Sequence, residues 1–360
     1  MKHLTRIDSR EEIKKLDKSN VLGSIEALPD QIQDAWTKAS QIKLPADYSQ
    51  VNNVVVMGMG GSALSTHIIK HLYKKDLQLP LEVYNHYEIP GYVNQDSLVI
   101  LFSYSGNTEE VLEAAVEASL KTKKILVITS GGKLKAFAQR QNFPIYLIDP
   151  IYNPSNQPRM AIGYTVFGQL ALFKTLGFIN LETSQVEKLV QRLKDTAFKL
   201  APEDKENNTA KYLAYAAFQK IIVLVSAEHL RGAAHVFNNQ LNENAKNLTI
   251  ELALPEMNHH YMEALPFPKQ TKENVIFFFF QSKLYHPRVQ VRVPLTNQVA
   301  EQEGYPTEII SATAPTKLEQ VFEIIQLGAY TNFYLAMLHG IDPAPIPKVD
   351  FFKAQLAKFN

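Results

Sequence analysis

The sequence predicts an α/β protein with two doubly wound domains, each a mainly parallel sheet flanked by helices. Apolar strands alternate with helices over residues 53–148, and strands that are almost continuously apolar are typical of parallel sheets covered on both faces. The alternation resumes after residue 220. Between these regions, the proline-rich stretch Asp149–Pro158 suits neither a helix nor a central strand. A chain of 360 residues can hold two domains of ordinary size.

The first half of the chain is expected to begin with helices and continue into the first sheet. Residues 9–45 predict two helices, the second from Ile25 to Ile42 with Trp36 on its apolar face. The strands and helices expected after them are 53–57, 61–75, 81–84, 97–102, 108–121, 124–129, 132–140 and 145–148.

The second half is expected to repeat this architecture after two connecting helices, Met160–Leu176 and Ser184–Leu200. The elements expected there are strands near 220–225, 247–252, 274–280 and 306–310, and helices near 229–244, 285–302 and 315–339. Two facing copies of one α/β unit would leave a cleft between the carboxyl ends of their strands. The expected division of the chain is N-terminal helices 1–50, first domain 51–152, connecting helices 153–205, second domain 206–342, and a C-terminal connector and helix 343–360.

Composition excludes several classes of partner and site. The chain carries 37 basic and 36 acidic residues, so its net charge of +1 favours neither nucleic acid nor an anionic membrane. It has no cysteine, which excludes disulfides and thiolate chemistry. Met1–Arg6 leads into a charged helix and not an apolar leader, and Val275–Phe280 is too short to span a bilayer. We therefore expect a soluble cytoplasmic protein without a membrane partner.

A turn rich in hydroxyl groups is the strongest candidate for a binding site. Ser103, Ser105 and Thr108 lie between the apolar strand Ser97–Phe102 and a predicted helix. The first N–H groups of a helix lack partners and favour an anion. Because this turn has no Lys or Arg, it suits a phosphate monoester better than a nucleoside triphosphate with magnesium. The alternative is an ordinary Ser or Thr helix cap.

A glycine-rich loop precedes this turn by one strand. Gly58, Gly60 and Ala63 match the loose dinucleotide-binding fingerprint, which favours an NAD-dependent oxidoreductase. That fingerprint also needs an acid at the end of the second strand, where this chain has Asn85, and Glu82 lies inside the strand. Paired with the serine turn, the glycine loop is better explained as part of a sugar-phosphate site.

Several segments together resemble one enzyme family. The stretches 58–62 and 103–108 resemble the phosphosugar loops of sugar isomerase (SIS) domains. From about residue 20 to the end, the chain resembles the bifunctional phosphoglucose/phosphomannose isomerases of archaea and bacteria. The segments that carry this resemblance are Gln157-Pro158-Arg159, Asn242-Glu243-Asn244-Ala245-Lys246, Glu256-Met257-Asn258-His259-His260 and Asp350-Phe351-Phe352-Lys353.

The resemblance implies two SIS-type domains and roles for individual residues. Glu243 would be the base that moves a proton between the first two carbons of the open-chain sugar, and Arg159 would stabilise the enediolate. An exposed helix glutamate and a structural linker arginine are the plainer alternatives. The residues implied to hold the phosphate are Ser62, Ser103, Ser105 and Thr108, with the loop backbone at Gly60 and Gly61.

Ring opening is assigned by the same resemblance to His259 and Lys353. In the family the histidine comes from the partner subunit, which implies a homodimer with shared active sites. We prefer His259 to His260 and Lys353 to the nearby Lys348. A metal site at His259 and Glu263 is a weaker alternative, and no metal or cofactor is expected.

The expected function is therefore interconversion of glucose 6-phosphate and fructose 6-phosphate, with mannose 6-phosphate as a further substrate. The alternatives are a non-catalytic SIS-type sugar-phosphate-binding protein or another phosphosugar isomerase. Glu228–Gly232 resembles a remnant of a second phosphosugar loop without its serines. The remaining histidines show no spacing typical of a metal cluster and are interpreted as structural or surface residues: His67, His71, His86, His235 and His339.

Overall fold

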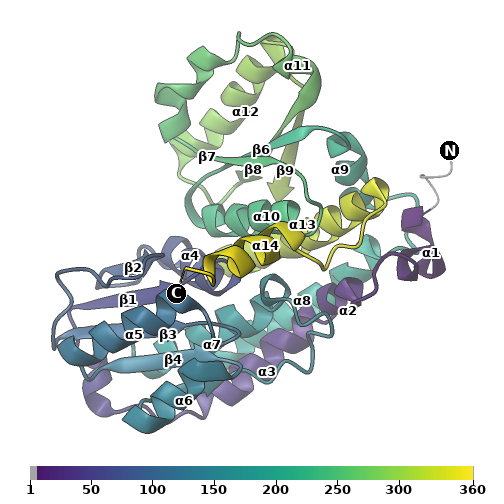
Figure 1. Cartoon of the computed structure of the whole chain (residues 1–360). Helices are drawn as coiled ribbons and strands as arrows, with labels where there is room; N and C mark the ends of the chain where they lie inside the picture. The colour runs from purple at the N-terminus through teal and green to yellow at the C-terminus, as the bar shows by residue number, and fades with distance from the viewer. Residues whose placement is uncertain (1–5, 360) are drawn as a thin grey trace.

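The computed structural model describes residues 6–359 and contains two parallel sheets joined through a layer of helices (Figure 1). The expectation made from the opening residues 1–5 lies outside the described residues. The two-domain α/β architecture predicted from the strand–helix alternation is confirmed. Within the described residues no helix is both long and apolar enough to cross a membrane.

The first sheet has five strands in the order β2-β1-β3-β4-β5, and every neighbouring pair is parallel. Its two faces are covered by different helices. The residues of one face pack against α5 and α6, and those of the other face belong to the large core that also includes α3, α4 and α7. The strands are β1 (Asn53–Gly58), β2 (Leu81–Tyr84), β3 (Ser97–Phe102), β4 (Ile125–Thr129) and β5 (Ile145–Leu147).

The second sheet has four parallel strands in the order β7-β6-β8-β9. This is the topology of the first sheet without its fifth strand, so β6 corresponds to β1 and β8 corresponds to β3. The strands are β6 (Ile221–Ser226), β7 (Thr249–Ala253), β8 (Val275–Ser282) and β9 (Thr307–Ala312).

The helices follow the predicted order with two corrections. The prediction of two N-terminal helices is wrong, because the segment forms three. Asn20 takes a left-handed backbone (φ 57°) before the second helix, and Pro29 lies in the first turn of the third. A proline there cannot sit inside a helix that starts at Ile25 without removing a hydrogen bond. The sequence prediction also missed the helices Thr209–Ala217 and Thr271–Asn274.

The α-helices are α1 (Arg10–Lys14), α2 (Val21–Glu26), α3 (Leu28–Ser40), α4 (Gly61–Leu72), α5 (Glu109–Lys121), α6 (Gly132–Gln141), α7 (Ile162–Thr175), α8 (Thr183–Leu200), α9 (Thr209–Ala217), α10 (Arg231–Glu243), α11 (Thr271–Asn274), α12 (Pro287–Gln302), α13 (Lys317–His339) and α14 (Pro347–Leu356). Short 3₁₀ helices are η1 (Arg6–Asp8), η2 (Ala46–Ser49), η3 (Pro158–Met160), η4 (Glu228–Leu230), η5 (Glu256–His259) and η6 (Tyr261–Ala264).

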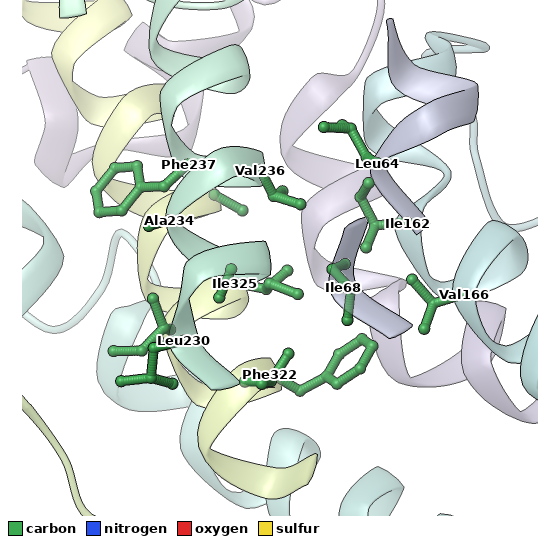
Figure 2. Packing of buried hydrophobic residues seen from close by; sticks show 14 of the residues in the cluster. Leu64, Ile68, Ile162, Val166, Leu230, Ala234, Val236, Phe237, Phe322 and Ile325 are labelled. Carbon is green, nitrogen blue, oxygen red and sulfur yellow. The ribbon is translucent and has the colours of Figure 1, made fainter. Parts of the chain in front are cut away.

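One hydrophobic core runs through both halves of the molecule. Figure 2 shows apolar side chains of α4, α7, α10 and α13 turned toward one another, with Ile68 of α4 opposite Ile325 of α13. Gly232 allows the close approach of α10 to α4, since a Cβ atom there would lie 2.4 Å from the Ile68 Cα. The two sheets therefore hold fixed positions relative to each other.

Candidate active site

The two predicted loops meet at the carboxyl edge of the first sheet. β1 and β3 are neighbours, and Gly58 pairs with Phe102 at their carboxyl ends. The Tyr104 N–H donates to the Ser62 Oγ at 3.0 Å, which ties the serine loop to the start of α4. The structure thus brings together the glycine loop and the serine loop.

The hydroxyl groups of the serine loop divide into two kinds. Ser103 is fully buried, and its Oγ accepts the N–H groups of Gly106 (3.1 Å) and Thr108 (3.4 Å). Ser62 is also buried. Ser105 is exposed and Thr108 is half-buried. Ser62 and Ser103 therefore shape the loops, whereas Ser105 and Thr108 present hydroxyl groups nearer the surface.

A third loop, Gly131–Gly132 after β4, packs against the serine loop. Gly106 has a left-handed backbone (φ 68°), and a Cβ atom on it would lie 1.9 Å from the Gly131 carbonyl oxygen. The Lys133 N–H also donates to the Asn107 Oδ1 at 3.2 Å. Only glycine fits at position 106, because both the φ angle and the space exclude a side chain.

Arg159 lies beside the glycine loop and is 1% exposed. A Cβ atom on Gly61 would lie 3.0 Å from the Arg159 backbone nitrogen, so the two segments are in contact. The guanidinium has five N–H donors, and each has an acceptor in the protein. These acceptors are Asn244 Oδ1 (2.5 Å), Gln157 Oε1 (2.8 Å), Glu243 Oε2 (3.2 Å) and the carbonyls of Pro343 (3.0 Å) and Ala344 (2.7 Å). Burial lowers the pKa of Arg159 and the Glu243 carboxylate opposes that shift, so the group stays charged.

Glu243 ends α10 and forms the ion pair with Arg159. Its side chain keeps 31% exposure, so the carboxylate is held by a buried cation yet reaches solvent. The next residue, Asn244, is fully buried and donates to the Asn332 Oδ1 of α13 at 2.8 Å. Gln240 donates to the Arg159 carbonyl at 2.9 Å. The sequence motif includes Asn244 without a role for it, and nothing in the sequence points to Gln240, because a buried amide carries no distinctive pattern.

The C-terminal connector is attached to the same cluster. Besides the two bonds from Arg159, the Lys246 Nζ donates to the carbonyls of Asp342 (3.1 Å) and Pro343 (2.9 Å). The connector leads into α14, where Lys348 and Lys353 are both exposed. Five residues apart on a helix, they point about 140° from each other.

His259 lies in η5, beyond β7 of the second domain, and is exposed. Within residues 6–359, no hydrogen bond or ion pair connects it to Glu243, Arg159 or the serine loop. Contacts within the single chain therefore link the loops, Arg159 and Glu243, and among the described residues none of these bonds reaches His259.

Both halves of the chain match known domain families. Residues 47–148 match the SIS domain family, and residues 206–356 match the family described as the bacterial phospho-glucose isomerase C-terminal SIS domain. The fold is similar to that of a solved hypothetical protein from Thermus thermophilus, with a TM-score of 0.75 at 15% identity over 99% of this chain and 94% of that chain.

Curated relatives align over nearly the whole chain. A bifunctional phosphoglucose/phosphomannose isomerase of Caldicellulosiruptor bescii is 32% identical over 94% of this chain and 99% of its own. One from Aquifex aeolicus is 29% identical over 87% of this chain and 92% of its own. With this identity and coverage, and with both domain matches, the chain belongs to the bifunctional phosphoglucose/phosphomannose isomerase family.

Proposed function

We propose that this protein is an aldose–ketose isomerase that interconverts glucose 6-phosphate with fructose 6-phosphate, and mannose 6-phosphate with fructose 6-phosphate. The observation that carries the proposal is the position of Arg159. The Arg159 backbone packs against Gly61, where the glycine loop enters α4, and its buried guanidinium pairs with Glu243 and donates to the C-terminal connector at Ala344. Its relatives named as isomerases support the same reaction.

Substrate binding begins with the phosphate. The exposed hydroxyl of Ser105, the half-buried hydroxyl of Thr108 and the N–H groups at the start of α5 supply neutral donors for the anion. Ser62, Ser103 and the backbone at Gly60 and Gly61 give the loops their shape. The sugar chain would then extend from this edge toward Glu243.

The proton transfer is assigned to Glu243. As a carboxylate it removes the proton on the second carbon of the open-chain aldose, which leaves a 1,2-enediolate, and it returns that proton to the first carbon to give the ketose. The hydroxyl proton moves from the second oxygen to the first. All Arg159 donors already have acceptors, so its charge would stabilise the enediolate through its field while it positions Glu243.

Mannose 6-phosphate differs from glucose 6-phosphate only in the configuration of the second carbon. Its isomerisation therefore needs the sugar to turn before it is reprotonated. The connector at Pro343 and Ala344 lies against Arg159. We therefore propose that this connector limits the space for that rotation. We also propose a cytoplasmic location, since the substrates are phosphorylated sugars and a chain without cysteine suits a reducing compartment.

A coupled spectrophotometric assay tests the function. Fructose 6-phosphate is supplied, and the glucose 6-phosphate that forms is oxidised by an added dehydrogenase with its own nicotinamide cofactor. We expect steady turnover without added metal or cofactor for the isomerase itself. Binding of fructose 6-phosphate without turnover would instead support a sugar-phosphate-binding protein.

We propose further that the active protein is a homodimer in which ring opening uses His259 of the partner subunit together with Lys353. His259 is exposed, so its side chain is available to a second subunit. The exposed aromatic residues Phe351 (67%) and Phe352 (62%) beside Lys353 offer apolar surface for a second copy.

Complementation tests this arrangement. Homodimers of His259→Ala and of Glu243→Ala should both be inactive, because neither can complete a site. A heterodimer has one site with both defects and one with neither. Co-expression makes about half of the dimers mixed, so about a quarter of the wild-type activity should return. Verified heterodimers without activity would place His259 in its own chain's site or point to His260.

A further inference from the structure

A cavity of about 320 Å³ lies between the two domains, away from the serine loop. The side chains that line it come from three elements: His67 and His71 of α4, Arg231 and His235 of α10, and Glu251 of β7. No sequence pattern groups them, since almost 200 residues separate the first from the last. The structure thus brings together three of the histidines that the sequence offers only as structural or surface residues.

Some polar groups of the cavity are paired with each other, and one buried nitrogen has no partner among the described residues. The rings of His67 and His235 lie 4.8 Å apart, and the His235 Nδ1 is 2.8 Å from the Glu251 Oε2. His71 is one helical turn beyond His67 on the same helix. The Nε of Arg231 is buried, and among the described residues it has no hydrogen-bond partner. Glu251 is thus occupied by His235, whereas Arg231 offers a buried donor.

Arg231 and Glu251 line the cavity with opposite charges, and Lys70 of α4 and Lys74 just beyond it add positive charge close by. Burial lowers the pKa of His67 to about 4, and His235, Lys70 and Arg231 add to that effect against Glu251. Burial also lowers the pKa of His71 to about 3, together with Arg231, His67, Lys70 and Lys74. Lys70 itself pairs with Glu82 at 2.7 Å. Both imidazoles are therefore neutral at pH 7, and each keeps one N–H that can donate.

We propose that this cavity binds a small oxyanion, either inorganic phosphate or the phosphate end of a small phosphomonoester, between Arg231 and the imidazoles of His67 and His71. A guanidinium with imidazole donors suits an anion and repels a cation. Within residues 6–359, moreover, no group of three His, Asp or Glu side chains is placed to hold a metal ion.

This site is distinct from the catalytic phosphate site. α4 begins at Gly61 in the glycine loop, and His71 lies ten residues further on, about 15 Å along the helix axis. α10 begins at Arg231 and ends at Glu243. An anion held between α4 and α10 would bridge the two domains at the ends of these helices that lie away from the reacting sugar.

Histidine signals give a direct readout of the cavity. The full-length protein is labelled with ¹³C-histidine, its imidazole signals are assigned from His67→Gln and His71→Gln variants, and it is titrated with inorganic phosphate. We expect saturable shifts of the His67 and His71 signals and a rise in the pKa of both. The pKa should rise because a bound anion favours the charged form of each imidazole.

Matched variants separate the two phosphate sites. Arg231→Gln should weaken phosphate binding at the histidines roughly tenfold, the loss of one charged hydrogen bond. Arg140→Gln removes the same charge from an exposed position of α6 and should leave that binding unchanged. Glycerol phosphate titrated in the same way shows whether a phosphomonoester is accepted, and either anion at the histidines supports the site.

Three results would overturn the proposal. Phosphate that leaves the His67 and His71 signals unmoved while it competes with substrate acts only at the serine loop. Equal affinity at the histidines in wild type and Arg231→Gln shows that the guanidinium is not a ligand. Zn²⁺ that saturates these signals when phosphate does not would make the cluster a metal site.

Discussion

The carboxyl edges of the two sheets have the same topology, but the first carries loops with accessible hydroxyl groups and the second is filled by packed side chains. After β1 and β3 the chain forms glycine and serine loops with hydroxyl groups at the surface. After β6 and β8, the equivalent places are filled by side chains. His229 is 1% exposed, its Nε2 is 2.9 Å from the Gln320 Oε1, and its ring packs on Tyr285 at 5.3 Å.

Ser282, at the end of β8, also packs at this carboxyl edge of the second sheet, which we call the filled edge. Its hydroxyl donates to the same Gln320 oxygen at 2.6 Å and accepts the Leu284 N–H at 2.9 Å. The comparison teaches that one topology can carry loops of small residues at the edge of one sheet and packed core side chains at the same edge of the other. What decides between them is whether small residues leave space at the strand ends. The second half contributes instead through the end of α10, where Glu243 lies.

The largest expected effect is at Glu243 of the second half, which we propose as the base. Glu243→Gln keeps the shape of the side chain and removes the carboxylate, so kcat should fall by roughly 100-fold or more. KM should change little, because the phosphate loops are untouched. Exchange of solvent deuterium into the second carbon should be lost with turnover. As a control at the filled edge, His229→Gln should retain kcat within about twofold. A Glu243→Gln enzyme with near-normal turnover would move the base elsewhere.

The next effect concerns the carboxyl edge of the first sheet, where the glycine and serine loops lie; we call it the open edge. Ser105→Ala and Thr108→Ala each remove one donor to an anion, a loss of about 1.5–3 kcal/mol, and should each raise KM roughly tenfold or more. Stability should hardly change in Ser105→Ala, since Ser105 is exposed. Thr108→Ala also removes the 2.7 Å hydrogen bond between the Thr108 and Ser103 hydroxyls, so its free energy of unfolding should fall by about 1 kcal/mol. If KM stayed normal in both variants, the phosphate would have to bind elsewhere.

Sequence patterns anticipated the open edge better than the rest of the site. The glycine and serine loops are local motifs at the ends of apolar strands, so the strand order alone brings them together. The contacts of Arg159 could not be foreseen, because two of its acceptors are the carbonyls of Pro343 and Ala344, which any residue could supply. The helix Thr209–Ala217 was missed because it is short and follows a polar stretch, although Ala210, Leu213, Ala214 and Ala217 have the spacing of one buried helix face.

The boundary between the two halves should be sensitive to acid. In the folded protein the pKa values of His67 and His71 lie near 4 and 3, below the unfolded value of about 6.5. The unfolded state thus binds more protons, so the stability these neutral histidines provide is present above pH 6.5 and is lost as the pH falls toward 4.

Urea unfolding in phosphate-free buffer measures this effect. From pH 7.5 to 5.5, the free energy of unfolding of the wild type should fall about 2 kcal/mol more than that of a His67→Gln/His71→Gln double variant. This difference is smaller than the full effect of two histidines, because both rings are partly exposed. Parallel curves for the two proteins would mean that the histidines titrate normally in the folded state. Added phosphate should reduce the difference if the cavity binds an anion.

The smallest effect is expected at the filled edge. Ser282→Ala removes a hydroxyl from the buried Gln320 network, but the Gln320 Oε1 keeps the His229 N–H as a donor. The Leu284 N–H loses its acceptor as well, so the free energy of unfolding should fall by about 1–2 kcal/mol. KM for fructose 6-phosphate should stay within about twofold of the wild-type value, in contrast to Ser105→Ala on the corresponding loop of the first sheet. A Ser282→Ala enzyme with a KM raised as much as that of Ser105→Ala would contradict the comparison, since it would mean that the second edge still contacts the substrate.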